Sequence, residues 1–558
     1  MMEYPRWLPL LLAFCMFSTG ASGLVNEYVL ATLTTYILGN SIEQFSIVIA
    51  LMMLMMGVSG LVQNKISDDN LILKFMGIEV VMAMLGGFAP LAIYAAYAFM
   101  DTHFLLVHYF FVLAIGFLIG FEIPIVMRII EQNKVKLKTN LTIVYAMDYI
   151  GAFVGAMVWV KYLLKNYSLT EISFIVAGFN FLVAAITIVY FMKSDVIKPR
   201  YRTSAVLIST ILILYIGFAN SLSLTDVLEQ KFYEDPIAHK ETTRYQHIVI
   251  TENTANGDVR LYINGNTQFS SLDEDRYHEL LVHPVMSLPK HGTSVLILGG
   301  GDGLALREVL KYKTVESVTL VDLDPDMVRL AKTNSYLRRL NKDSFRDARL
   351  VTSVAGGITE LGVKGLYMQA NESASELDKG EWVASIMVVN LDADLFLNKI
   401  AKKKWDVVII DLPDPSSVEL AKLYSKQFYK KLKRNLSKDG FVAIQSTSPY
   451  HAKSAFLTIG STLEAAGYKV LPYRQNIPSF GDWGFHIAWT DKKPVSEVKG
   501  HLSKVDSFPV DTRFITPELM MASTAFGQGE LVSGEECVNT IMNPCLVTQY
   551  LDYSWQIE

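Results

Sequence analysis

Seven long apolar stretches in the first 222 residues constrain the fold of this 558-residue chain more than any other feature. Each stretch is close to or longer than the roughly 20 residues that a helix needs to cross about 30 Å of hydrocarbon. We therefore predict a multi-pass α-helical membrane domain of about seven helices over residues 1–222. The stretches cover approximately residues 8–36, 44–63, 71–98, 104–130, 141–164, 169–192 and 203–221.

Charged residues are unevenly distributed along the chain. Of its 50 Lys and Arg and 55 Asp and Glu, only 13 and 12 lie in residues 1–222. The remaining residues carry 37 basic and 43 acidic side chains, an ordinary density for a soluble protein with a mildly acidic balance. That balance excludes a general binder of nucleic-acid phosphates and suits cationic ligands. We therefore expect membrane lipid around the first part and no nucleic acid as a partner.

Five ionisable residues lie within the apolar stretches, namely Glu27, Glu79, Glu122, Arg128 and Asp148. A charge at the bilayer centre costs roughly 2.5–3.5 kcal/mol even on lenient scales, so such groups usually face a bundle interior or a cavity. Either these residues form a polar path or binding cavity, or they make ion pairs and interfacial contacts with no transport role. Arg128 lies at the end of a stretch and is expected at the membrane interface.

Residues 223–290 have the pattern of a small β subdomain. Tyr245–Ile250 and Val259–Ile263 alternate between apolar and polar side chains, as strands do. The pairs Asn256-Gly257 and Asn264-Gly265 follow these runs, and Asn-Gly between alternating runs is a strong hairpin signal. A small antiparallel sheet is the expected product.

Strands and helices alternate after Gly292, which predicts an α/β Rossmann-like domain of the class I methyltransferase type over residues 291–492. The apolar strand Val295–Leu298 leads directly into Gly299-Gly-Gly-Asp-Gly303, and a second strand ends at Asp322. Glycines let the backbone approach a ligand at the end of the first strand, and an acid at the end of the second can bind ribose hydroxyls. The combination predicts a nucleoside site.

Acidic residues are expected to gather at this site. Asp302 lies inside the glycine loop, where it would repel a pyrophosphate and suit a positively charged ligand such as a sulfonium nucleoside with an amine. A later strand, Trp405–Ile410, is followed by Asp411 and Asp414. Because ligands bind at the carboxyl ends of strands in open α/β sheets, these acids should converge with Asp322 on one crevice. The alternative is that they cap helices.

These motifs resemble those of one family, the polyamine aminopropyltransferases, of which spermidine synthase is the best known. The resemblance runs from about Tyr245 to Thr490, and the whole chain is similar to the membrane-spanning branch of that family. The matching segments are Tyr245–Ile248, Gln268–Glu279, Gly299–Glu308, Asp411–Pro415, Gln445–Pro449 and Pro478–Phe485.

The resemblance implies a role for each candidate site residue. Asp411 is implied as the general base, and Asp414, Tyr277 and Phe480 would bind the acceptor amine. Phe480 stands where soluble spermidine synthases have Tyr, which leaves the identity of the acceptor open. Gln268 and Glu279 are expected as further contacts. The implied donor-binding residues are Gln246, Asp302 for the ammonium of the aminopropyl group, Asp322 for the ribose, Asp392 for the adenine, and the glycines Gly299, Gly301 and Gly303.

The implied reaction transfers an aminopropyl group from decarboxylated S-adenosylmethionine to a di- or polyamine, such as putrescine, and releases 5′-methylthioadenosine. A free amine with a pKa near ~10 is mostly protonated at neutral pH, so a carboxylate must remove a proton as the amine attacks. Decarboxylated S-adenosylmethionine is then a co-substrate, and no metal or cofactor is required. We allow for a homodimer. Two alternatives stay open: an S-adenosylmethionine-dependent methyltransferase, and a polyamine-binding membrane sensor or transporter.

Three further features lie outside the matching motifs. An insertion over about residues 350–387 ends in a polar stretch and is expected as a surface loop rather than a mobile lid. Residues 493–558 form a C-terminal extension, expected to cap the domain or to contact the membrane domain. Cys537 and Cys545 are close enough to pair in an oxidising compartment, but we expect two buried thiols.

The chain is expected to be a multi-pass protein of a bacterial inner (cell) membrane. Basic loops around residues 134–138 and 198–202 lie on the same side as the amino terminus, which puts that side in the cytoplasm. Seven crossings would put the second half outside, whereas six crossings, with 203–221 on or re-entering the membrane, would keep it inside. Because the implied donor is a cytoplasmic metabolite, we expect the catalytic domain on the cytoplasmic face.

Overall fold

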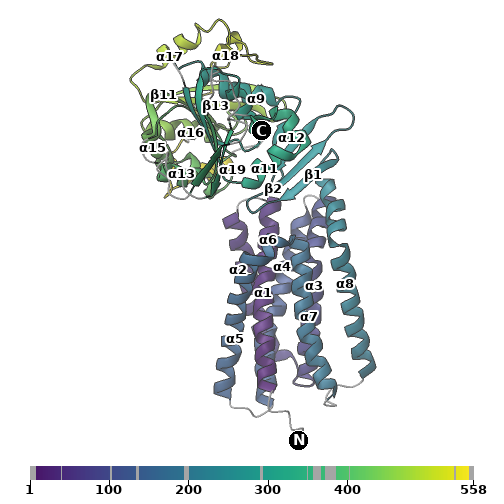
Figure 1. Cartoon of the computed structure of the whole chain (residues 1–558). Coiled ribbons are helices and arrows are strands. Elements are labelled where there is room, and N and C mark those ends of the chain that lie inside the picture. Colours follow the sequence, from purple (N-terminus) through teal and green to yellow (C-terminus); the bar gives the residue numbers. More distant parts are fainter. Residues whose placement is uncertain are drawn as a thin grey trace. The chain divides into compact units, whose positions relative to one another are not determined.

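The computed structural model divides the chain into two compact units, Met1–Pro236 and Ile237–Glu558 (Figure 1). The predicted boundary at residue 222 falls inside the last helix of the first unit, which continues to Glu229. The boundary between the two units therefore lies further along the chain than the end of the last apolar stretch suggests. The structure describes residues 8–38, 41–100, 103–132, 137–193, 200–289, 293–347, 350–355, 366–370, 385–400, 403–532, 534 and 536–551.

The first unit is a bundle of long helices that coincide with the predicted apolar stretches. Among the described residues, seven helices are long and apolar enough to cross a membrane. The fifth is interrupted by a π-helical turn, Trp159–Leu163, before the short α6 (Leu164–Asn166). The long helices are α1 (Leu8–Leu38), α2 (Ser41–Val62), α3 (Leu71–Met100), α4 (Phe104–Gln132), α5 (Leu137–Val158), α7 (Leu169–Lys193) and α8 (Arg200–Glu229).

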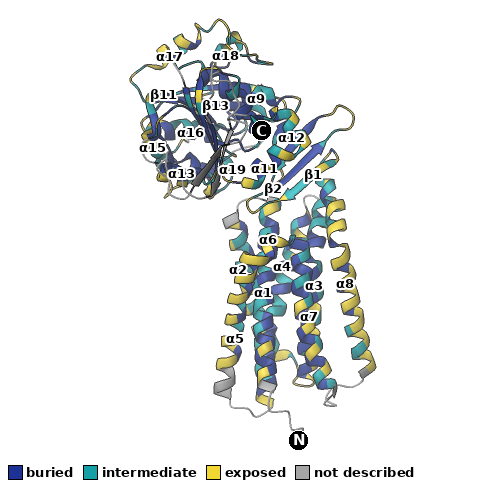
Figure 2. Ribbon diagram, viewed as in Figure 1, coloured by how far each residue is buried: buried dark blue, intermediate teal, exposed yellow. Residues whose placement is uncertain are grey.

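Polar residues within the bundle lie mainly in its interior. Glu79 of α3 and Glu122 of α4 are buried, and Ser22 of α1 hydrogen bonds to Asn180 of α7. Arg128, near the end of α4, is half-buried, and its guanidinium binds the loop between α2 and α3 through Asp68 and the carbonyl of Ile66 (2.6 Å). By contrast, α8 presents mostly exposed apolar side chains (Figure 2).

The second unit begins with the predicted small sheet. Its strands β1 (Ile237–Thr242), β2 (His247–Glu252), β3 (Val259–Ile263) and β4 (Asn266–Ser270) pair antiparallel in sequence order. Gly257 and Gly265 have φ angles of 74° and 81°, the left-handed conformation that hairpin turns require. The two Asn-Gly turns of the sequence therefore form as predicted.

The main sheet of the second unit has nine strands in the part of the chain that the structure describes, in the order β12-β13-β11-β10-β5-β6-β9-β7-β8. Strands β11, β10, β5, β6, β9 and β7 are parallel, and β12, β13 and β8 are antiparallel to their neighbours. The strands are β5 (Thr293–Gly299), β6 (Val315–Asp322), β7 (Leu350–Ala355), β8 (Leu366–Ala370), β9 (Ser385–Asn390), β10 (Trp405–Asp411), β11 (Leu436–Gln445), β12 (Lys469–Ile477) and β13 (Gly481–Trp489).

The prediction that residues 350–387 form a surface loop is in part wrong. Strands β7 and β8 lie within residues 350–387 and extend the sheet beyond β9, where a surface loop was expected. Most of the polar stretch 369–380 lies outside the described residues.

Helices cover both faces of this sheet. Successive side chains of each central strand point alternately into the apolar cores on the two faces. In β5, Val295 and Ile297 join one apolar cluster, whereas Leu296 and Leu298 join the other. The first cluster is covered by α9 (Glu274–Met286), α10 (Leu304–Leu310), α11 (Pro325–Thr333) and α12 (Ser335–Asn341). The second is covered by α13 (Ala393–Lys399), α15 (Lys426–Asn435) and α16 (Lys453–Ala465).

The C-terminal extension packs on both clusters of the second unit. It contains α17 (Val495–Leu502), α18 (Pro517–Ala522) and α19 (Cys545–Leu551). Val498 and Met520 enter the first cluster, and Leu546 enters the second. The expectation of two thiols is wrong, because Cys537 and Cys545 form a disulfide that closes the loop before α19.

Candidate active site

The sheet brings the predicted acids together at the carboxyl ends of its central strands. Asp411, the last residue of β10, pairs in register with Gly299, the last residue of β5. Asp322 ends the next strand, β6, whose register aligns Val321 with Leu298. Three parallel strands therefore deliver the glycine loop and two carboxylates to one edge, as the Rossmann pattern predicts.

The glycine loop passes so close to Asp411 and Asp322 that two of its positions cannot carry a side chain. Gly299 has a φ of 87°, and a Cβ built there would lie 1.9 Å from the carbonyl oxygen of Asp411. A Cβ at Gly301 would lie 2.6 Å from a carboxylate oxygen of Asp322. Gly303 follows as the N-cap residue of α10. Gly299 and Gly301 are required because the Asp411 backbone and the Asp322 carboxylate fill the space that a side chain would need.

Asp302 and Asp322 supply two carboxylates to the predicted donor site. Asp302 Oδ1 accepts a hydrogen bond from the backbone N–H of Leu304 (2.9 Å), at the start of α10. Asp322 Oδ1 accepts from the N–H of Asp324 (2.8 Å). Burial, together with the negative charges of Asp324 and Asp302, raises the pKa of Asp322 to about 7. A ligand that brings hydroxyl donors and positive charge would stabilise both carboxylates.

Asp411 is oriented by a neighbouring helix. The hydroxyl of Tyr277, on α9, donates to Asp411 Oδ1 at 2.8 Å. Burial raises the pKa of Asp411 to about 6, while the positive charge of His278 and the Tyr277 hydrogen bond oppose that rise. The result is a carboxylate that is ionised at neutral pH yet basic enough to accept a proton.

Asp414 lies three residues later and is held by three donors from different elements. Its Oδ1 accepts from Gln445 Nε2 (3.2 Å), and its Oδ2 accepts from the hydroxyls of Thr447 (3.3 Å) and Tyr550 (2.9 Å). Burial raises the pKa of Asp414 to about 6, and these hydrogen bonds act in the opposite direction. Tyr424 is hydrogen bonded to the carbonyl of Pro413 (3.0 Å), which fixes the loop between the two acids.

Aromatic side chains pack beside Tyr277, the hydrogen-bond partner of Asp411. Phe480 packs against Tyr277, with ring centroids 6.1 Å apart, and against Trp483 at 5.0 Å. Phe480 offers no hydroxyl, and the phenol that reaches Asp414 comes from Tyr550 in the C-terminal extension. An apolar wall beside two carboxylates suits the methylene chain of an alkyl amine.

A buried ion network beneath Tyr277 was missed by the sequence reasoning. His278 Nδ1 contacts Glu274 at 2.9 Å, and Glu274 is paired with Arg307 at 2.6 Å. Burial alone would lower the pKa of His278, but the bond to Glu274 raises it to about 9. His278 is therefore a fixed cation near Asp411. Its position directly after Tyr277 was the available signal, but a single His is usually a core residue.

Three predicted site residues do not lie among the acids, namely the donor-binding Gln246 and Asp392 and the further contact Gln268. Gln246 belongs to a turn whose Thr243 hydroxyl binds Asp324 (2.6 Å), so it lies beside the loop that follows Asp322. Asp392 follows β9, caps α13 through the N–H of Leu395 (2.8 Å) and pairs with Lys422 (3.1 Å). Gln268 donates to Asn266 within its own hairpin (3.1 Å), and no contact within the described residues joins it to the acids.

Glu279 is not brought to the acids either, although it was expected as a site contact. Its carboxylate is fully buried and accepts backbone N–H bonds from Arg513 (2.6 Å), Phe514 (2.8 Å) and Ile515 (2.9 Å). Glu279 is two residues after Tyr277 on α9, and residues two apart point to different sides of a helix. Glu279 thus fastens the C-terminal extension to α9.

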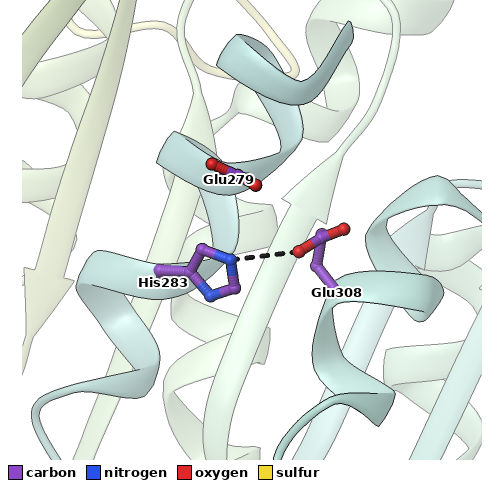
Figure 3. A group of neighbouring side chains, drawn as sticks. All are labelled: Glu279, His283 and Glu308. Carbon is purple, nitrogen blue, oxygen red and sulfur yellow. Dashed lines mark ion pairs between the residues drawn. The ribbon is translucent and has the colours of Figure 1, made fainter. Parts of the chain in front are cut away.

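Glu279, His283 and Glu308 form a buried group whose ligand atoms are close enough to hold a metal ion (Figure 3). His283 Nε2 contacts Glu308 at 3.0 Å, and Glu308 is also paired with Arg307 (2.7 Å) and Lys311 (2.5 Å). These cations already neutralise the carboxylate, and Glu279 is occupied by three N–H donors. The group therefore has the partners of a structural ion network rather than those of a metal site.

Comparisons with known proteins show which family the chain is similar to. Residues 274–362 and 383–500 match the family model described as the spermine/spermidine synthase domain. Polyamine aminopropyltransferase 1 of Streptomyces coelicolor is 36% identical and aligns over 99% of this chain and 96% of its own. Polyamine aminopropyltransferase of Oceanobacillus iheyensis is 33% identical, over 96% and 95%. A solved spermidine synthase in complex with the transition state analogue AdoDATO is 24% identical, with a TM-score of 0.41, and covers 53% of this chain and 88% of that chain.

Proposed function

Because this chain belongs to the polyamine aminopropyltransferase family, we propose that it transfers the aminopropyl group of decarboxylated S-adenosylmethionine to a di- or polyamine. In this reaction the acceptor nitrogen forms a bond to the propyl carbon next to the sulfonium. The bond from that carbon to sulfur breaks, its electron pair returns to sulfur, and 5′-methylthioadenosine leaves. The acceptor amine loses one proton, which Asp411 accepts.

The observation that carries this proposal is the position of Asp411 beside the glycine loop. The parallel register places this carboxylate next to Gly299, on the edge where Asp322 ends the neighbouring strand. A nucleoside held by the loop and by Asp322 would therefore present its sulfonium side near the residue that takes the proton. The nucleophile, the base and the leaving group would then lie close together, and this proximity lowers the activation barrier of the reaction.

The acceptor would be recognised at both of its ends. An alkyl diamine carries two ammonium groups at neutral pH, and one must become a neutral amine before it attacks. Asp411 would serve the attacking end, and Asp414 would bind the ammonium at the other end. The apolar wall of Phe480 and Trp483 would contact the methylenes between them.

The negative charge of the donor site favours the decarboxylated donor over S-adenosylmethionine itself. Asp302 lies close enough to Asp322 for its negative charge to help raise the pKa of Asp322. The carboxylate of S-adenosylmethionine would add a third negative charge, whereas the decarboxylated donor brings an ammonium. A methyltransferase would have to bind the carboxylate of S-adenosylmethionine beside these two acids.

Turnover by the detergent-purified full chain tests the proposal. The chain would receive decarboxylated S-adenosylmethionine and a panel of diamines and polyamines, with products identified by mass spectrometry. We expect a product heavier than its acceptor by one aminopropyl unit. Asp411→Asn should lower kcat by about 10²- to 10⁴-fold, the usual effect of removing a general base.

Asp439→Asn is the matched control for this variant, because the Asp439 side chain is 76% exposed and 3.9 Å from Lys493. It should retain wild-type activity. Product formation by Asp411→Asn at a wild-type rate would contradict the role of Asp411, and binding of polyamines without any product would favour a sensor or transporter.

The helical unit is proposed to anchor the enzyme in lipid. Support comes from seven long apolar helices in the described residues and from their exposed apolar side chains. A bacterial cell membrane is the proposed location, in line with the bacterial relatives named above.

A further inference from the structure

One residue outside all of the recognised motifs reaches the candidate active site. Tyr550, on the C-terminal helix α19, donates its hydroxyl to Asp414 Oδ2 at 2.9 Å. This is the shortest of the three hydrogen bonds that the Asp414 carboxylate accepts. Nothing in the motif at residues 411–415 indicates a partner 136 positions later in the chain.

The segment that carries Tyr550 is docked through its own contacts. Leu546 is fully buried in the apolar cluster under the sheet, and Gln549 hydrogen bonds to Thr458 of α16. Asn539 donates its amide to the carbonyl of Ala421 (2.8 Å), and its backbone N–H donates to Thr462 (2.9 Å). These contacts fix α19 without help from a substrate, so the phenol is positioned before the amine arrives.

The chemistry of the pair suits recognition of an ammonium group. A carboxylate that accepts neutral O–H and N–H donors keeps its full negative charge, and each donor favours the ionised form over the neutral acid. Gln445 and Tyr550 bind different oxygens of Asp414, which fixes the plane of the carboxylate. Hydrogen bonds to a charged group are the stronger kind, so loss of one should be measurable.

We propose that Tyr550 is a positioning residue of the acceptor site, which holds Asp414 in the orientation and charge state that bind the distal ammonium of a di- or polyamine. This inference rests on the proposed function, because it assigns a further residue to the same site. Tyr550 acts through Asp414 and takes no part in the bond changes at the sulfonium.

The variant Tyr550→Phe tests the proposal, since it removes the hydroxyl and keeps the ring. We expect the KM for the amine to rise about tenfold, the typical effect of one lost hydrogen bond to a charged group. The KM for the nucleoside donor and kcat should stay within about twofold. The acidic limb of kcat/KM for the amine should move to higher pH, because Asp414 loses a donor that favours its ionised form. A merely structural tyrosine would change none of these quantities selectively.

Two comparisons make the test specific. Thr548→Val, an exposed change on the same helix, should leave both KM values unchanged. Tyr550→Phe should have no further effect on the amine KM in an Asp414→Asn background, because the residue acts through that carboxylate. An unchanged amine KM in Tyr550→Phe, or an equal effect in the Asp414→Asn background, would overturn the proposal.

Calorimetric titration with the same amines separates this inference from the proposed function. Wild-type protein that binds amines but forms no product would contradict only the reaction. The affinity ratio between wild type and Tyr550→Phe would still report on Tyr550, and a ratio of one would contradict only its role.

Discussion

At the scale of single residues, the ionisation of Asp411 and Asp414 predicts the pH dependence of the reaction. Burial raises the pKa of each of them to about 6, so both carboxylates become protonated as the pH falls below 6. Protonated Asp411 cannot accept the proton of the amine, and protonated Asp414 cannot pair with an ammonium. We expect kcat/KM for the amine to fall below about pH 6, with a slope that approaches two.

The measurement is a pH profile of initial rates with saturating donor and subsaturating amine. Asp439→Asn should reproduce the wild-type limb, because Asp439 is an exposed surface acid. A rate that is constant between pH 5 and 7 would show that neither carboxylate must be ionised.

The contrast between Asp411 and Tyr550 shows how far sequence reasoning reaches at this scale. Asp411, Asp322 and Asp302 follow predicted strands or lie in the glycine loop, so the parallel sheet determines where they meet. Tyr550 and the bond from Tyr277 to Asp411 depend on how helices pack on that sheet, which no local pattern encodes. Glu279 illustrates the converse, because the family motif contains it but three backbone N–H groups of the extension occupy its carboxylate.

At the scale of elements, Glu279 joins the C-terminal extension to α9, and its removal should loosen that attachment. In Glu279→Gln, the amide would replace one carboxylate oxygen with an N–H₂ group facing backbone donors. We expect a loss of about 2–4 kcal/mol in unfolding free energy, because a buried charge-assisted network is left partly unsatisfied. The amine KM should change little, since no contact in the described part of the chain joins Glu279 to Asp411 or Asp414.

Thermal unfolding, together with limited proteolysis around residues 511–516, measures this effect. Glu497→Gln, an exposed change on α17, is the control and should unfold like the wild type. If Glu279→Gln unfolded like the wild type but lost affinity for the amine, the result would support the site contact expected from the sequence and contradict the attachment role.

Most elements of the second unit could be read from periodicity, and the exceptions have a physical reason. The buried strands β5, β6 and β10 are short apolar runs with clear carboxyl ends, so their last residues lie close to those predicted, although β5 and β6 begin earlier. Strands β7 and β8 lie at the sheet edge, within the segment that was expected from the sequence to be an insertion. Pairing at an edge depends on the neighbouring strand, so the segment alone does not reveal it.

At the scale of the whole molecule, the helices of the first unit were predicted closely because stretches of the length and apolar composition that a bilayer crossing requires are easily recognised in a sequence. The structure bears on the remaining choice between six and seven crossings through α8. It is one uninterrupted helix of 30 residues, and apolar residues such as Ile208, Ile211 and Tyr215 are exposed on it. A helix lying on the membrane would have one charged face.

Seven crossings, together with the basic loops, would put the second unit on the non-cytoplasmic face, opposite to the expectation based on the donor. The disulfide Cys537–Cys545 agrees, because disulfides persist in oxidising compartments. We therefore expect a membrane-impermeant maleimide to label Asp439→Cys in intact cells. Asp69→Cys, in the loop between α2 and α3, should react only after lysis. The reverse pattern would mean that α8 does not cross, and would put catalysis beside the cytoplasmic supply of the donor.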